Sequence, residues 1–517
     1  MRVAFFSPLP PMKSGIADYS AELLPQLAEE CEIELIVEEG FRPDPALASR
    51  FPVHGHRALP RLLEQGRFDV VLYQLGNNSD YHAAIYRTLL AHPGVVVLHE
   101  FVLHHLVREL TLEANRPDLY VDELRYAYGR TGEAAGRRCL ATGVSLDLWS
   151  YPLFERVVDA SRGVIVHNRF TRDRVLASRP LARVATVPHH LSLDAKRPRP
   201  KTLTPVPSPA PSHPPHRERG TRLEVSCLSP SSPGEGGWEG EGEEGRGDEG
   251  LGWGNSAQAR AALGIDAGDF VVATFGFMTP AKRPAVLLRA FARLRQEMPR
   301  ARLLIVGEVS RHFDFERILM TGTAELRQGV TITGRLELDR FLLYMQACDL
   351  AVNLRHPTGG ETSGTMIRLL GLGKPLIVNN SGAFAEIPDD CCAKVDLDDT
   401  EEELLLAYLR AFAADEPLRR RMGENARRHM AMHHTLAGSA RGYADFLRET
   451  VAMNVQPFRA VPPLTASPED DLLSDLVRDV SAEMVDLGVG EEDDDLLREI
   501  SGELVGLDLD ESLGKAR

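Results

Sequence analysis

Short apolar runs, continuous and rich in β-branched residues, recur along the chain with helix-like segments between them. The runs of the first half are residues 2–7, 33–38, 69–75, 94–100, 163–168 and 184–189, and those of the second half are residues 269–277, 301–308, 329–335, 349–355 and 375–380. A strand that is buried on both faces shows no polar alternation, which is typical of parallel sheets covered by helices. The pattern therefore predicts an α/β protein with two doubly wound, Rossmann-like domains.

Two stretches break this alternation and divide the chain. Residues 196–255 are rich in proline and glycine and lack apolar periodicity, so we expect a low-complexity, disordered linker insertion between the domains. A proline-rich break near residue 460 precedes an acidic tail. The expected organisation is a first domain at 1–195, the linker at 196–255, a second domain at 256–435, a crossover helix at 436–456 and the tail at 457–517.

The formal net charge of −16 is concentrated in the tail, where residues 461–517 hold 17 acidic and 4 basic side chains. The rest of the chain is nearly neutral, which argues against general nucleic-acid binding. The tail repeats a short amphipathic pattern at 475–487 and 495–507. Two interpretations are open, namely docking peptides that fold on a protein partner and a plain solubilising tail.

The cysteines and the longest apolar runs indicate the compartment. The six cysteines show no metal-ligand spacing, which favours free thiols in a reducing environment. No apolar run reaches the ~18–20 residues that a membrane span needs. We therefore expect a cytoplasmic protein. The arginine-bearing helical stretch at 101–160 leaves two alternatives, a peripheral contact with the inner face of an anionic membrane and a solvated helix face.

Residues 354–375 contain a loop that leads into a helix in the way an anion site does. Two glycines precede Glu361, and Ser363 is a suitable N-cap for the helix that follows. A helix N-terminus leaves backbone N–H groups free to face negative charge. The pattern predicts a phosphate site in an open α/β sheet, and an ordinary strand–helix turn is the alternative. The residues concerned are Glu361, Thr362, Ser363, Gly364 and Thr365.

Two other loops follow predicted strands. Gly15 follows the first strand, where it either lets the backbone approach a ligand closely or makes the turn. No GxGxxG pattern is present there, so a dinucleotide fingerprint is absent. Lys282 and Arg283 stand between the strand at 269–277 and the helix at 284–299. Because cations are disfavoured at a helix N-terminus, their position favours an anionic ligand over two solvated charges.

Three histidines occupy equivalent places in the first domain. His99, His167 and His189 each lie at the carboxyl end of a predicted strand. Ligands bind beyond these ends in doubly wound sheets, so the shared position indicates a site. A lone histidine at such a place is more often structural. Nothing in the spacing of the three demands a metal ion.

The ordered set of motifs resembles the retaining group 1 glycosyltransferases (family 4), which have the two-domain GT-B fold. The segment SPLPPMKSGIADYS resembles the family's acceptor-side glycine loop, LHE its N-domain histidine near the donor sugar, and VIVHN and TVPHH its last N-domain strands. Gly276-x5-Lys282 matches its phosphate signature, and LIVGE and GETSGTMIRLLGLGKPLIV follow in family order. The resemblance covers residues 1–195 and 256–455.

The resemblance implies the activity and the site. It implies that the two domains face a cleft, and that a hexose passes from a UDP- or GDP-hexose to a glycan, lipid or small-molecule acceptor with retention, without a metal or a further cofactor. Glu361 would position the sugar hydroxyls, and His99 would act near the reacting carbon. It further implies products such as surface polysaccharide or glycolipid. The implied donor-binding residues are Gly15, Gly276, Lys282, Arg283, Thr362, Ser363, Gly364 and Thr365.

The chain also departs from the family pattern. The family's second glutamate, which typically holds the nucleotide ribose, would fall on Leu369 or Arg368, and neither is acidic. The family's arginine after the signature glycine is Phe277 here, for which Arg283 is a substitute. We interpret this as a variant of the family. The alternatives are a non-catalytic GT-B scaffold whose tail repeats recruit partners, and a nucleotide-sugar epimerase or sugar phosphorylase on the same fold.

Overall fold

The structure is a computed structural model that describes residues 1–193, 256–310, 313–320 and 322–459. These residues belong to one compact unit, Met1–Arg459. The linker insertion expected at 196–255 lies outside the described residues. The acidic tail expected at 457–517, with both of its repeats, also lies outside them apart from its first three residues.

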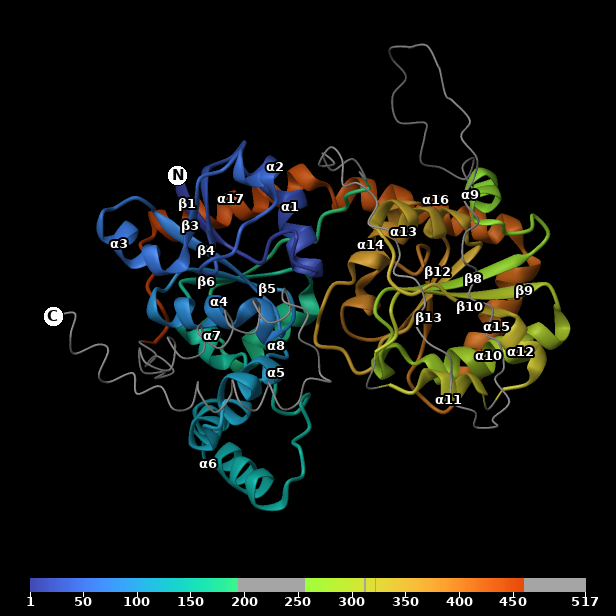
Figure 1. The fold of residues 1–517 in the computed structure, drawn as a ribbon, viewed down its shortest axis with the longest axis horizontal. Helices are drawn as coiled ribbons and strands as arrows, with labels where there is room; N and C mark the ends of the chain where they lie inside the picture. Colours follow the sequence, from blue (N-terminus) through green and yellow to red (C-terminus); the bar gives the residue numbers. More distant parts are fainter. Residues whose placement is uncertain (194–255, 311–312, 321, 460–517) are drawn as a thin grey trace, which may run out of the picture. The chain divides into compact units, whose positions relative to one another are not determined.

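The first sheet contains seven parallel strands in the order β3-β2-β1-β4-β5-β6-β7 (Figure 1). Strands β2 and β3 extend the sheet on one side of β1, and β5, β6 and β7 extend it on the other side, beyond β4. The topological switch point therefore lies between the carboxyl ends of β1 and β4. The strands are β1 (Arg2–Phe6), β2 (Glu32–Val37), β3 (Val53–Gly55), β4 (Val70–Leu75), β5 (Val95–Leu98), β6 (Gly163–Val166) and β7 (Val184–Thr186).

Helices connect these strands. The central strands are buried on both faces, as in β4, where every residue is buried, because helices cover the sheet on each side. The helical elements are α1 (Gly15–Leu27), α2 (Pro45–Ala48), η1 (His56–Ala58), α3 (Leu59–Glu64), α4 (Ser79–Ala91), α5 (His104–Arg108), η2 (Glu109–Glu113), α6 (Pro117–Thr142), α7 (Glu155–Ala160) and α8 (Arg169–Ser178).

The second sheet contains six parallel strands in the order β10-β9-β8-β11-β12-β13, with its switch point between β8 and β11. The strands are β8 (Phe270–Phe275), β9 (Ala301–Val306), β10 (Val330–Ile332), β11 (Leu350–Asn353), β12 (Leu376–Asn379) and β13 (Ala393–Val395). The two parallel sheets with their helices confirm the predicted α/β class and the two Rossmann-like folds.

The helices of the second half include the last elements of the described chain. They are α9 (Ser256–Leu263), η4 (Pro280–Lys282), α10 (Pro284–Glu297), α11 (Phe315–Met320), α12 (Ala324–Gln328), α13 (Leu338–Ala347), α14 (Gly364–Gly371), η5 (Gly382–Glu386), α15 (Glu401–Ala414), α16 (Glu416–His433) and α17 (Leu436–Ala452). Although α17 follows the second sheet in sequence, it packs in the core of the first, where Tyr443 Oη and Tyr19 Oη lie 2.8 Å apart.

Some local features differ from the expectation. The strands β3 and β13 have three residues each, too few for a periodic signal, and the sequence did not predict them. Gly15, which was expected in a loop, is the first residue of the first helix, because Ser14 Oγ accepts a hydrogen bond from Ile16 N and caps it. Among the described residues, no helix is both long and apolar enough to cross a bilayer.

Candidate donor-binding site

The N-terminus of α14 lies just beyond the carboxyl end of β11. Ser363 Oγ accepts a hydrogen bond from Met366 N at 3.3 Å, which confirms the predicted N-cap. The same oxygen bonds to Thr365 Oγ1 at 2.8 Å and accepts a bond from Asn353 Nδ2 at 3.1 Å. The cap is therefore fixed by the last residue of β11, and the first turn of α14 is held at the switch point of the second sheet.

Lys282 meets this helix terminus at the end of β8. Gly276 has a φ of 88°, a conformation that L side chains rarely adopt. A Cβ at Gly276 would lie 3.0 Å from Lys282 Nζ and 3.6 Å from Thr365 Cγ2. The ammonium, the bare glycine backbone and the first turn of α14 thus border one small space. A cation and a helix N-terminus, beside a glycine that leaves no side chain between them, are together suited to hold a phosphate.

The Lys282 side chain is buried, and this changes its protonation. Burial lowers the pKa of Lys282 to about 7; the Arg355 charge lowers it further, and the Glu361 charge opposes the fall. The ammonium donates a hydrogen bond to Phe275 O. A buried amine without a paired carboxylate is a costly arrangement that an anionic ligand would relieve, and such perturbed groups are typical of functional sites.

Arg283 does not join Lys282. Its φ is 54°, and its guanidinium pairs with the buried carboxylate of Glu401 at the start of α15, with Nε 2.9 Å from Oε1. Asn379 Nδ2 donates to the same Glu401 oxygen at 3.0 Å. The charge of Arg283 is therefore neutralised by a carboxylate of the second domain. Its expected contact with a donor phosphate, and its service in place of an arginine at Phe277, remain predictions.

Glu361 is held by its own loop and by β11. Arg355 Nε lies 3.1 Å from Glu361 Oε1, and Thr358 Oγ1 donates to Glu361 Oε2 at 3.0 Å. About a quarter of the carboxylate side chain is exposed, with a relative accessibility of 24%. The acid is thus positioned on both oxygens and still accessible, as a group that binds sugar hydroxyls must be.

The loop that carries Glu361 is bonded to the first domain. Phe101 N donates to Gly359 O at 2.7 Å. Asn168 Nδ2 donates to Gly360 O at 2.7 Å and to Thr362 Oγ1 at 3.0 Å, and Thr171 Oγ1 donates to Gly360 O at 2.9 Å. Residues that follow β5 and β6 therefore hold the loop against the first domain.

Glu100 follows His99 at the end of β5 and lies against this loop. Its Oε1 accepts a hydrogen bond from Asn77 N at 3.1 Å, and its Oε2 lies 3.3 Å from the place that a Cβ at Gly359 would take. Burial and the nearby Glu361 charge raise the pKa of Glu100 to about 8, against the opposing effects of the Asn77 bond and Arg355. The sequence prediction missed Glu100, although its place at a strand end next to His99 was a usable signal.

The predicted histidines come together around Tyr19 of α1. The ring of Tyr19 lies 5.0 Å from that of His99, 5.2 Å from that of His167 and 4.7 Å from that of His189, between ring centroids. His190 adds a fourth imidazole 4.4 Å from the same tyrosine and was not predicted. The shared position at strand ends thus predicted a real cluster. Burial lowers the pKa of His99 and His189 well below its ordinary value and that of His167 to about 4, so the rings are neutral.

His99 has a defined tautomer. Its Nε2 lies 2.8 Å from Gln74 Oε1, and because an amide oxygen only accepts, Nε2 carries the proton. The Nδ1 atom of His99 is therefore left as an acceptor. A neutral imidazole in this state can accept a hydrogen bond from a sugar hydroxyl, whereas it cannot supply a proton from Nδ1.

Arg368 and Leu369 are the two positions at which the family's second glutamate was expected. Nη2 of Arg368 lies 2.7 Å from Glu22 Oε1 on α1, and His190 Nε2 lies 3.3 Å from the other Glu22 oxygen. Leu369 is buried in the core. Neither position therefore carries an acid, and Arg368 is a base that is paired across the two domains.

Gly15 lies at the start of α1, and its surroundings are open. A Cβ built at this position would meet no atom within 4 Å. The backbone of Gly15 is therefore accessible, but the structure does not bring it to Lys282 or Glu361. Its expected role in donor binding remains a prediction.

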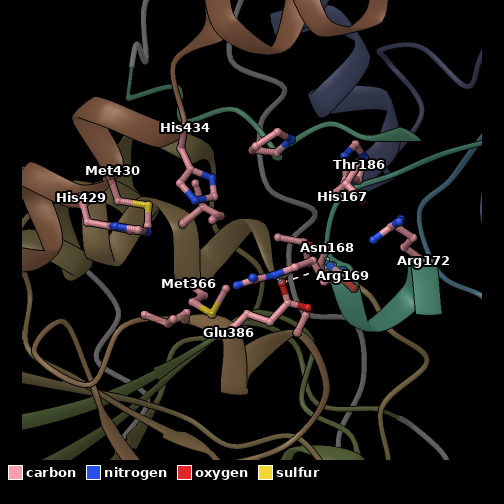
Figure 2. Close-up of a pocket in the computed structure, with 15 residues that line it drawn as sticks. His167, Asn168, Arg169, Arg172, Thr186, Met366, Glu386, His429, Met430 and His434 are labelled. Atoms are coloured by element: carbon pink, nitrogen blue, oxygen red, sulfur yellow. Dashed lines mark hydrogen bonds and ion pairs between the residues drawn. The ribbon is translucent and has the colours of Figure 1, made fainter. Parts of the chain in front are cut away.

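A cavity of about 580 Å³ lies between α8, η5 and α16. Figure 2 shows Arg169 and Arg172 of α8 on one side of it and His429, Met430 and His434 on the other. Glu386 of η5 accepts hydrogen bonds from Arg169 N at 3.0 Å and Phe170 N at 2.6 Å. Of the residues predicted to bind the donor, only Thr362 lines this cavity, and His167 of the histidine cluster lines it as well.

A metal centre finds no support among the described residues, which contain no group of three or more His, Cys, Asp or Glu arranged to hold a metal ion. The structure brings together Gly276, Lys282, Thr365 and, through Arg355, Glu361. It also brings the Glu361 loop to the end of β5, where His99 stands. The functional residues that sequence reasoning missed are Glu22, Glu100, Asn168, His190 and Arg355.

Comparison with known proteins agrees with this geometry. Residues 255–429 match the family model of the group 1 glycosyl transferases. A segment of 57 residues is 47% identical to D-inositol 3-phosphate glycosyltransferase of Segniliparus rotundus, but it covers only 11% of this chain and 13% of that protein. The matched region of the second half is the one that contains Gly276, Lys282 and the Glu361 loop.

Two solved structures show the fold of the whole described unit. Sucrose-phosphate synthase from Thermosynechococcus elongatus is similar with a TM-score of 0.55 and 14% identity, over 88% of this chain and 100% of that one. HepE of Anabaena, solved in complex with UDP, is similar with a TM-score of 0.52 and 14% identity, over 87% and 100%. The likeness shows the GT-B fold.

Proposed function

We propose that this protein is a glycosyltransferase that moves a hexose from a nucleotide sugar to an acceptor, with retention at the anomeric carbon and without a metal ion. The observation that carries the proposal is the space beside Lys282. There a buried ammonium, the bare Cα of Gly276 and the first turn of α14 converge, within the region that matches the group 1 family model.

The donor diphosphate binds in this space, because the buried Lys282 gains the anionic partner that it lacks among the described residues. The hexose then extends toward Glu361, whose charge lies near that of Lys282, and toward the end of β5, which is bonded to the same loop. Glu361 accepts hydrogen bonds from sugar hydroxyls, and His99 accepts one at Nδ1. The UDP in the HepE structure supports a uridine nucleotide as the donor.

The transfer needs electrostatic stabilisation more than a protein base. The bond between the anomeric carbon and the phosphate oxygen breaks, and the bond to the acceptor oxygen forms on the same face of the sugar. The proton of the acceptor passes to the departing phosphate. Lys282 and the N-terminus of α14 stabilise the charge that develops on the diphosphate, which is the role of preorganised donors at a leaving group. Because these groups are cationic or partly so, the site supplies a function that a metal ion performs elsewhere.

Product analysis tests the proposal. The purified full chain is incubated with UDP-glucose, GDP-mannose and ADP-glucose, with and without simple sugar and lipid acceptors, and the products are followed by proton NMR. We expect an α-linked product from an α-linked donor. A β-linked product would contradict retention, and an epimerised or phosphorolysed sugar would assign the fold to another reaction.

A non-catalytic scaffold is the second candidate, and one observation favours it. Arg368 stands where an acid would hold the ribose, and its pairing with Glu22 spans the two domains. A chain that has lost nucleotide binding has no need to keep this part of the site open. Under this proposal the chain binds no nucleoside diphosphate. The product assay would then give no product, and a binding assay would detect no nucleotide binding.

A further inference from the structure

Two carboxyl groups, one from each domain, approach the same point beside Gly359. Glu100 Oε2 lies 3.3 Å and Glu361 Oε2 lies 3.5 Å from the position that a Cβ at Gly359 would take. The two oxygens can therefore be no farther apart than the sum of these distances. A ligand oxygen midway between them would lie at hydrogen-bond distance from both carboxyls.

The position is held open by the backbone on either side. Phe101 N donates to Gly359 O at 2.7 Å, which fixes the end of β5 against the loop. Asn77 N bonds to Glu100 Oε1 and leaves Oε2 without another hydrogen bond among the described residues. A side chain at residue 359 would place its Cβ in contact with both acids, and glycine avoids this contact.

The chemistry of the pair suits a hydroxyl group. We propose that Glu100 and Glu361 together bind one hydroxyl of the donor sugar, with Glu100 as the uncharged hydrogen-bond donor and Glu361 as the charged acceptor. A hydroxyl group both donates and accepts hydrogen bonds. A protonated carboxyl can donate to its oxygen, and a carboxylate can accept from its O–H. Glu100 is thereby a specificity-determining residue for the sugar. This inference rests on the proposed transferase function.

The charges around the pair assign the proton to Glu100. Arg355 Nε forms an ion pair with Glu361 Oε1 at 3.1 Å. Among the described residues Glu100 has no ion-pair partner, and burial with the Glu361 charge raises its pKa to about 8. The charged groups that act on the pair are Arg355, beyond the end of β11, and Lys282, beyond the end of β8, whose charge interacts with both Arg355 and Glu361. An acid with a raised pKa beside a carboxylate that is paired with a cation is the one that keeps the proton.

Binding measurements isolate the contribution of the sugar. Calorimetry gives the Kd of UDP and the Kd of UDP-glucose at several pH values from about 6.5 to 9.5, and the ratio of the first to the second is calculated at each pH. If another nucleotide binds, the same ratio is measured for that nucleotide and its sugar form. Lys282 contacts the diphosphate of both ligands, so its titration cancels in this ratio. We expect the wild-type ratio to fall by about fivefold above pH ~8, where Glu100 loses its proton and its hydrogen bond.

Three variants complete the test. Glu100→Gln keeps a neutral hydrogen-bond donor, so its ratio should stay near the wild-type value of neutral pH and should not fall above pH ~8. Gly359→Ala places a methyl group between the carboxyls at a residue whose φ is not positive, so UDP should still bind while the preference for the sugar is lost. Glu64→Gln, at an exposed position on α3, is the control and should follow the wild type.

The outcomes separate this inference from the function on which it rests. If no nucleoside diphosphate binds, the transferase proposal fails and this one falls with it. If the nucleotides bind but Glu100→Gln shows the same loss above pH ~8 as the wild type, or Gly359→Ala keeps the full preference for the sugar, the paired-carboxyl proposal alone is overturned. Unfolding midpoints of the variants at each pH confirm that the proteins compared are folded.

Discussion

Arg368 of α14 and Glu22 of α1 form an ion pair, with 2.7 Å between Nη2 and Oε1, that joins the two domains at the place where a ribose-binding acid was expected. Both side chains are largely buried, with relative accessibilities of 16% and 12%. Burial alone would raise the pKa of Glu22, but the bond to His190 and the charge of Arg368 outweigh it and lower the pKa. Under the proposed function, the nucleotide would bind beside a pair that is already formed.

Removing one partner of this pair should destabilise the fold. We expect Glu22→Gln or Arg368→Met alone to cost about 3 kcal/mol in the free energy of unfolding, because each leaves a mostly buried group without its partner. The double variant should recover much of that loss, since neither charge remains buried. Urea unfolding of the four proteins measures the coupling, and strictly additive losses would show that the two residues act independently.

The histidine cluster should make stability depend on pH. The folded pKa of His167 is about 4, below the unfolded value of about 6.5, so the unfolded chain binds the proton first as the pH falls. We expect His167 to lower the free energy of unfolding by up to about 3 kcal/mol as the pH falls from ~6.5 to ~4.

The variant His167→Gln isolates this effect. Its free energy of unfolding should decline less than that of the wild type between these pH values, measured by chemical denaturation at each pH. His105→Gln, at an exposed position on α5, is the matched control. If the stability of His167→Gln falls with pH in parallel with that of the wild type, His167 does not cause the pH dependence.

Lys282 should carry a stability cost that its function explains. Its folded pKa of about 7 lies below the unfolded value of about 10.4, so the penalty for charging the buried amine grows as the pH falls from ~10 to ~7 and is complete below that. We expect Lys282→Met to be more stable than the wild type by up to ~4 kcal/mol at neutral pH, with a smaller gap at pH ~10. Thermal and urea unfolding at both pH values measure the gap, and a destabilised Lys282→Met would contradict the prediction.

Asn168 should matter for turnover through the Glu361 loop. Its Nδ2 donates to Gly360 O and Thr362 Oγ1, while its Oδ1 accepts from Thr171 N and caps α8. Asn168→Asp keeps the cap and removes the donor, so we expect turnover to fall by about tenfold or more as the loop loses its position. Asn168→Ala should lose the cap as well, which costs about 1 kcal/mol. Equal turnover in Asn168→Asp and the wild type would show that these bonds do not position the loop.

Sequence patterns predicted the fold because most strands of both domains are continuous apolar runs that are separated by helix-like segments. They also predicted the cap at Ser363 and the meeting of His99, His167 and His189, since strand ends converge at one edge of a parallel sheet. The three-residue strands β3 and β13 were too short to show a period. For Arg283, the attraction of a cation for an anionic ligand was a sound argument, but a buried carboxylate at Glu401, 118 residues away in sequence, takes up the charge.

Apart from Arg355, which pairs with Glu361 in the same loop, the missed residues share one property, which is that their partners lie far away in the chain. Glu22 pairs with Arg368, 346 residues later, and Asn168 bonds to Gly360, 192 residues later. Glu100 is notable only because Glu361 stands near it. Contacts of this kind arise from the juxtaposition of two domains, for which a single sequence without covarying relatives contains no signal.

Calorimetry of UDP, GDP and ADP with the wild-type chain and Lys282→Met is the most direct test of the central claim. We expect one of these nucleotides to bind to the wild type. The affinity for that nucleotide should fall by about 100-fold or more in the variant, because the buried cation that faces the diphosphate is gone. Since Lys282→Met is expected to be the more stable protein, unfolding cannot explain such a loss. Equal binding by the two proteins, or no binding by the wild type, would contradict the assignment of this space to a nucleotide-sugar donor.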